Sequence, residues 1–154
     1  MLDILDAKIS EINGLIELSP DPDSEGLCDK GEYFIGLGFV AIQQYLVETI
    51  IFTGLSKSEA YKLGPGHSFG STSINLINSC ANWWKHEPEW WDTGGISKSG
   101  KATFERVSNV TESRSYQLSN VLATFCGDNT LSFKYVIPVL EEWREDVHSI
   151  SKKA

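Results

Sequence analysis

The feature that most constrains the fold is a run of 15 residues without a charged side chain, from Tyr33 to Val47. A helix that crosses a bilayer needs about 20 predominantly apolar residues. This run is shorter and contains Gln43 and Gln44. We therefore expect a helix over 33–52 that is apolar nearly all round and is packed on several sides at the centre of the fold.

The other apolar residues recur at helical spacing. The first stripe advances in steps of three and four and consists of Leu2, Leu5, Ile9, Ile12 and Ile16. Similar stripes predict helices that start near 72, 101, 118 and 136. A capping box at Ser56 and Glu59 predicts a short helix that precedes these four. No sustained period-2 alternation and no internal repeat is present. A chain of 154 residues is one domain's worth, so we predict an all-α, single-domain bundle of six to seven helices over 1–154.

Glycine and proline mark the expected breaks. Loops are predicted over 19–31, 64–70 and 92–100, where these residues gather. Pro88 should end the helix before it, because proline lacks the backbone N–H and clashes with the preceding turn. Pro138 should either kink the last helix or lie in its first turn.

The charge is acidic and unevenly placed. Thirteen Lys and Arg against 21 Asp and Glu give a net charge of 13 − 21 = −8, and residues 1–60 hold 11 acids against 3 bases. Nucleic acids and anionic lipids bind clustered basic groups, so this balance argues against both as ligands. A basic protein remains as a partner, and the candidate contact residues in the loop are Asp21, Asp23, Glu25 and Asp29.

The cysteines and the first residues indicate the compartment. Cys28, Cys80 and Cys126 are odd in number, far apart and without a Cys-x-x-Cys pair, which is typical of reduced thiols rather than a disulfide framework or a zinc site. The chain starts with acids where a signal peptide has bases. We expect a cytoplasmic protein without a cofactor.

The acidic loop also has the spacing of a calcium loop. With Asp21 at position 1, the further positions 3, 5, 6, 9 and 12 are Asp23, Glu25, Gly26, Asp29 and Glu32. Calcium takes six to eight oxygen ligands around a turn that glycine makes easily. The loop thus resembles an EF-hand, although it has Glu at position 5, Pro22 inside it and no second loop to pair with. A single calcium site at 21–32 is a lesser alternative.

A second motif is Gly66-His67-Ser68-Phe69-Gly70, which fits the G-x-S-x-G pattern and looks like the nucleophile elbow of α/β-hydrolases. Asp128 and His148 complete the order of a triad. An elbow must follow a buried strand, whereas 56–63 is predicted to be helical. We interpret the segment as a loop between helices.

Four of the five tryptophans lie between 83 and 91, at a helix end and across Pro88. Tryptophan beside charged residues is typical of binding hot spots. One interpretation is an aromatic anchor patch, for which the candidate residues are Glu87, Glu89, Trp90 and Trp91. The other is that these rings close one end of the bundle, because tryptophan is usually well buried.

The run Ala81-Asn82-Trp83-Trp84-Lys85-His86 with Trp90 resembles a segment of small, uncharacterised helical bacterial proteins. It is also reminiscent of the HEPN-type helical nucleases, whose active site is an Arg followed after four to six residues by a His. No Arg stands at that distance before His86, and Arg144 has three residues between it and His148, one fewer than that spacing. This resemblance implies a ribonuclease, intact or degenerate, or an abortive-infection type of protein, with His86 and Lys85 at its site.

Two function classes follow. A small, acidic, helical domain looks like the bacterial immunity proteins and antitoxins that mask a basic toxin, which predicts a non-enzymatic inhibitor of a basic protein partner. The alternative is the HEPN-like enzyme, in which His86 acts as the acid or base. The first class fits the charge, and it is our sequence-based expectation.

Overall fold

The structure is a computed structural model that describes residues 1–67, 70–92, 95–110 and 115–151, with side chains except at positions 91 and 92. These residues form seven α-helices and a 3-10 helix and contain no strand, which confirms the predicted all-α bundle. In chain order the elements are α1 (Leu2–Leu18), α2 (Leu27–Ile50), α3 (Lys57–Ala60), α4 (Ser73–Asp92), α5 (Lys98–Ser108), α6 (Gln117–Cys126), η2 (Phe133–Tyr135) and α7 (Ile137–Ser151).

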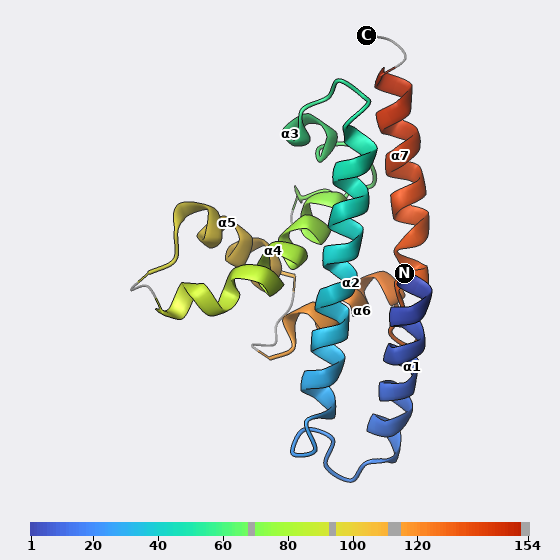
Figure 1. Cartoon of the computed structure of the whole chain (residues 1–154), viewed down its shortest axis with the longest axis vertical. Coiled ribbons are helices and arrows are strands. Elements are labelled where there is room, and N and C mark those ends of the chain that lie inside the picture. Colours follow the sequence, from blue (N-terminus) through green and yellow to red (C-terminus); the bar gives the residue numbers. More distant parts are fainter. Residues whose placement is uncertain (68–69, 93–94, 111–114, 152–154) are drawn as a thin grey trace.

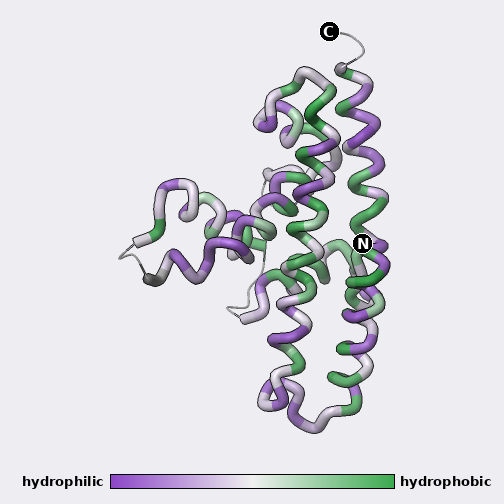
Figure 2. Tube along the Cα trace, viewed as in Figure 1, coloured by the Kyte–Doolittle hydropathy of each residue, from purple (hydrophilic) through white to green (hydrophobic). Residues whose placement is uncertain are grey.

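α2 is the central element. It runs along the length of the molecule, with α1 and α7 end to end on one side of it, while α4 and α5 extend to the other side (Figure 1). α2 packs against α1, α4 and α6, and α7 packs against α4 and η2. Hydrophobic residues recur along nearly the whole of α2 (Figure 2). α2 is also the one described helix long and apolar enough to span a membrane, a property that the core helices of soluble proteins share.

The core lies where α2, α4, α6 and α7 meet, and it includes Phe39, Ile77, Leu122 and Trp143, each fully buried. Glycine lets two aromatic rings approach α2 closely. A Cβ atom at Gly36 would lie 1.7 Å from the Trp84 ring, and one at Gly38 would lie 2.0 Å from the Phe133 ring. These contacts are incompatible with any larger residue at either position.

Two predicted helix ends are wrong. α2 begins at Leu27, directly after Gly26 in a left-handed conformation at φ +66°, so the loop is shorter than 19–31. α4 continues past Pro88 to Asp92, and the packing of Trp90 on Trp83 at a ring distance of 5.4 Å holds its last turn. Pro138 lies in the first turn of α7, one of the two predicted positions.

Candidate functional site

The turn between α1 and α2 forms an acidic end of the molecule. Asp21 accepts a hydrogen bond from the Ser24 backbone N–H at 3.2 Å, and its bonds with Ser24 lower the pKa of Asp21. Asp21, Glu25 and Asp29 are all exposed. Within the described residues no ion pair involves any of them, so their charge is not neutralised by a neighbouring cation.

Two carboxylates of the predicted loop bind the start of α6 and its N-cap residue. Glu32, on α2, accepts hydrogen bonds from the backbone N–H groups of Leu118 at 2.7 Å and Ser119 at 2.9 Å. Its Oε2 also accepts one from the Ser119 hydroxyl at 2.6 Å. The Tyr116 hydroxyl donates to Asp23, and this bond raises the pKa of Tyr116. The acidic turn is thereby fixed to the N-terminus of α6.

The structure does not gather the calcium-loop residues around one point. Asp29 and Glu32 lie within α2 rather than in a loop, and Glu32 is engaged by α6. No group of three His, Cys, Asp or Glu side chains that suits a metal ion occurs in the described part of the chain.

Three tryptophans at the end of α4 pack against other aromatic rings. Trp83 stacks on Phe104 of α5 at 5.4 Å, and Trp84 meets the edge of Tyr33 at 5.5 Å. Trp90 is only 8% exposed, so it is not available as the surface anchor predicted for it. The side chain of Trp91 lies outside the described residues. Glu87 is partly exposed, and Glu89 is exposed.

A polar network joins α2 to α4. The amide of Gln43, which is 8% exposed, donates to the Oδ1 atoms of Asn78 at 2.8 Å and Asn82 at 3.0 Å. Lys85 Nζ donates to Gln43 Oε1 at 2.7 Å, and partial burial lowers the pKa of Lys85. The Lys85 ammonium is therefore directed at α2.

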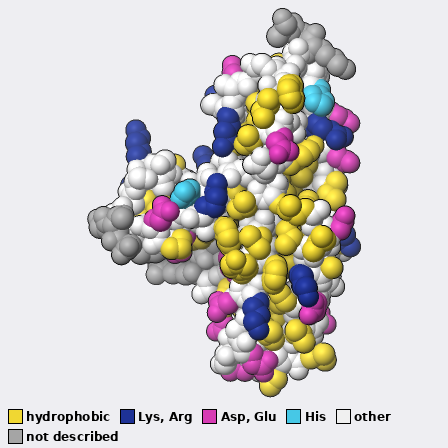
Figure 3. Space-filling view, in the orientation of Figure 1, with side chains coloured by type: hydrophobic (Ala, Val, Ile, Leu, Met, Phe, Trp, Pro, Cys, Tyr) yellow, Lys and Arg dark blue, Asp and Glu magenta, His cyan; other side chains and the backbone are white. Residues whose placement is uncertain are grey.

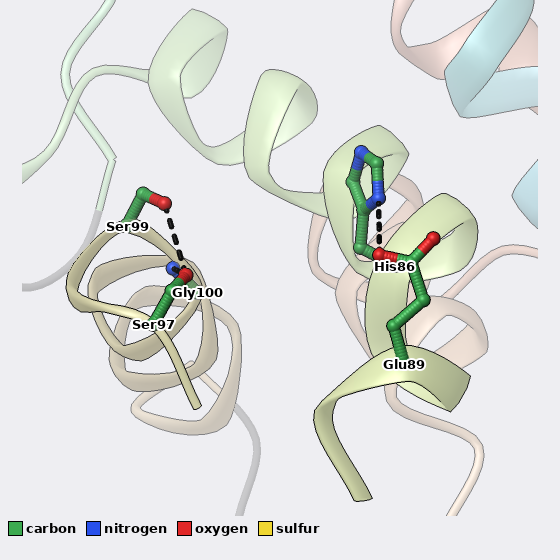
Figure 4. A network of polar contacts seen from close by, with 5 residues as sticks. All are labelled: His86, Glu89, Ser97, Ser99 and Gly100. Atoms are coloured by element: carbon green, nitrogen blue, oxygen red, sulfur yellow. Dashed lines mark hydrogen bonds and ion pairs between the residues drawn. The ribbon is translucent and has the colours of Figure 1, made fainter. Parts of the chain in front are cut away.

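His86 has an orienting partner that the sequence did not identify. Its Nδ1 lies 3.2 Å from Glu89 Oε2, one helical turn away. The two residues face a cleft of about 390 Å³ between α4 and the start of α5, which Asn82 and Thr103 also line. The Ser97 and Ser99 hydroxyls, 3.1 Å apart, lie on the α5 side (Figure 4). In the neutral imidazole Nδ1–H donates to the Glu89 carboxylate, so the Nε2 atom carries the lone pair that can accept a proton.

The structure describes only part of the G-x-S-x-G motif and of its triad order. Ser68 lies outside the described residues. His67 binds Thr124 through Nε2 at 3.1 Å, and His148 lies on α7. The short helix α3 precedes the motif, as predicted, so the strand of a nucleophile elbow is not present.

The sequence did not predict a large hollow in the surface. It has a volume of about 850 Å³, is mostly apolar and lies where α1, α2 and α7 meet. Its lining includes Leu5, Leu37, Val40 and Ile137. A second hollow, of about 350 Å³, adjoins it towards the C-terminal end of α2 and is lined by Phe52 and His148. The sequence does carry a signal for this hollow, because the 33–52 run is apolar nearly all round. The run predicts a helix packed on several sides, whereas one of its sides borders the hollow.

No family model, no curated protein and no solved structure matches this chain.

Proposed function

We propose that the protein is a non-enzymatic inhibitor of the immunity or antitoxin type, which binds a basic protein through its acidic end. The observation that supports this most is the turn between α1 and α2. Its exposed carboxylates Asp21, Glu25 and Asp29 have no ion-pair partner among the described residues, and they are held on a turn fixed to α6 by Glu32. A charged surface that is rigid before binding loses less entropy on association.

The expected mechanism is electrostatic steering. A net charge of −8, with six of the acids in the segment from Glu17 to Glu32, attracts a basic surface over distances comparable to the Debye length, about 8 Å at physiological salt. Steering of this kind raises association rates and makes them fall with ionic strength. Once the complex has formed, the acidic end covers the basic site of its partner and thereby blocks it.

The test is a tagged pull-down from the native lysate at low and moderate salt, with mass spectrometry of the bound proteins. A stoichiometric basic protein that is released by salt is expected. The triple variant Asp21→Lys, Glu25→Lys and Asp29→Lys should then bind it at least tenfold more slowly. An equally charged control carries lysine at three exposed acids of α7, namely Glu141, Glu142 and Glu145. Equal loss in both variants, or an empty eluate, would reject the proposal.

One observation favours a second candidate function, acid–base catalysis of the HEPN-like kind at His86. It is the Glu89 carboxylate 3.2 Å from the imidazole, at the edge of a cleft. General acid–base catalysis contributes about 10²- to 10⁴-fold in rate. RNA cleavage that His86→Ala abolishes and Glu89→Gln weakens, with unchanged melting temperatures, would support it. Because Lys85 binds Gln43, it has no assigned role in this chemistry.

A further inference from the structure

One face of the central helix is not covered by any described element. The outward stripe of α2 and the turn after it is apolar except at Gln44 and Glu48, and its apolar members are Tyr33, Leu37, Val40, Ala41, Val47, Ile51 and Phe52. Phe52 is 91% exposed and Ile51 is 64% exposed. Hydrophobic side chains form a band across this face of the molecule, and acidic side chains gather below it (Figure 3). Contiguous apolar surface of this kind marks an interaction site.

This face contains both a protrusion and a matching hollow. Phe52 protrudes at the C-terminal end of α2, while the hollow of about 850 Å³ surrounds Val40. The two positions are 52 − 40 = 12 residues apart, or about 18 Å at 1.5 Å per residue. A surface with both features on one helix can bind a second copy of itself, because each copy supplies the ring that the other accommodates.

The charges of the face are also self-complementary. Glu48 and Arg144 have opposite signs and both line both hollows. They form no ion pair with each other or with any other described residue, and Glu48 accepts a hydrogen bond only from the neutral Gln44 amide, at 2.9 Å. In a two-fold arrangement each carboxylate would face the guanidinium of the other copy, so both charges gain an oppositely charged partner.

We propose that this face is the interface of an antiparallel homodimer, with the two α2 helices related by a two-fold axis between Tyr45 and Val47. This axis places Phe52 of each copy opposite Val40 of the other. It also separates the acidic ends, which lie about 20 residues from the axis and therefore about 60 Å from each other. That separation is many Debye lengths, so the charge of −8 per chain does not oppose the pairing. The proposal is independent of the proposed function.

The first experiment is light scattering coupled to size exclusion, at chain concentrations from about 1 to 100 μM. The wild type should have twice the chain mass of 17.1 kDa, and Phe52→Glu should have the mass of one chain. Because Phe52 is 91% exposed, its replacement leaves the fold intact, as circular dichroism will verify. Leu18→Glu, at an 85% exposed residue of α1, is the matched control and should remain dimeric. A monomeric wild type at every concentration would overturn the proposal.

Cysteine cross-linking tests the orientation. In a Cys28→Ser background, Val47→Cys lies beside the axis and should form an intermolecular disulfide on mild oxidation, whereas Tyr33→Cys, far from the axis, should not. Cross-linking at both positions would indicate a parallel pair. A dimer that Phe52→Glu does not dissociate would place the interface elsewhere. Either result rejects the antiparallel model, as does a monomer that takes up a different protein on this face.

Discussion

At the scale of single residues, the most unusual group is the Tyr61 hydroxyl. Tyr61 is 3% exposed, and its oxygen has no hydrogen-bond partner among the described residues. A buried polar group without a partner costs about 1–3 kcal/mol relative to one that is satisfied. Burial also raises the pKa of Tyr61 to about 12, because the charged form is disfavoured.

Tyr61→Phe is therefore expected to stabilise the protein. Removing the unpaired oxygen should raise the free energy of unfolding by about 0.5–1 kcal/mol at neutral pH, measured by urea denaturation. Tyr33→Phe, at a 55% exposed ring, is the control and should change little. A Tyr61→Phe protein that is less stable than the wild type would show that the hydroxyl has a partner.

The same residue predicts a dependence on alkaline pH. The pKa of Tyr61 in the folded chain, about 12, lies above its ordinary value of 10.0. The folded state therefore keeps the Tyr61 proton to a higher pH than the unfolded state does. As a result, the free energy of unfolding should fall as pH rises from 10 to 12. The stability difference between the wild type and Tyr61→Phe, measured by melting curves, should widen over this range, because only the wild type loses this contribution. A stability difference that stays constant over this range would contradict the raised pKa of Tyr61.

At the scale of elements, glycines decide how closely the helices approach. Gly36→Ala should destabilise the protein by several kcal/mol, because the new Cβ atom would lie 1.7 Å from the Trp84 ring at the α2–α4 contact. Gly14→Ala, inside α1 with nothing within 4 Å of the new atom, should instead stabilise it by about 0.5–1 kcal/mol. Thermal denaturation compares the two variants. Equal effects would mean that backbone propensity, not packing, sets the result.

Glu32 connects two elements, and its replacement separates the structural role from the calcium alternative. Glu32→Gln weakens two charge-assisted bonds to the N-terminus of α6, which should lower stability by about 1–2 kcal/mol in calcium-free buffer. Glu25→Gln, at an exposed residue of the same turn, should be neutral. Millimolar calcium should leave the melting temperature of the wild type unchanged. A calcium-dependent rise that Glu32→Gln removes would restore the metal site.

Elements are also the scale at which sequence reasoning worked best. Helical periodicity predicted the all-α class, and the capping box at Ser56 and Glu59 is formed as predicted, with the Ser56 N–H bound to Glu59 at 2.9 Å. Local patterns did not reveal that Glu32 caps a helix 86 residues away, because that contact depends on tertiary packing. The contact between His86 and Glu89 lies within one helix and was missed because the helix was predicted to end at Pro88. The burial of Trp90 agrees with the second interpretation of the tryptophans, in which the rings close one end of the bundle.

At the scale of the whole molecule, Asp6 joins α1 to the segment before α7, two parts of the chain that are far apart in sequence. It accepts hydrogen bonds from the Phe133 N–H at 2.7 Å and the Ser132 hydroxyl at 2.8 Å. Asp6→Ala leaves these donors without their acceptor and should cost about 1–3 kcal/mol. Hydrogen exchange should increase both in α1 and around η2. Asp3→Ala, exposed on α1, is the control, and faster exchange confined to α1 would contradict a link between these two parts.

The contacts of Asp6 and Glu32 have a consequence for synthesis of the chain. Their partners lie 127 and 86 residues further on, so an emerging chain contains α1 and α2 long before either carboxylate has its donors. During that interval the apolar side chains of α2 lack α6, and until residue 92 they lack the whole of α4 as well. We expect ribosome-bound fragments that end before residue 118 to recruit chaperones.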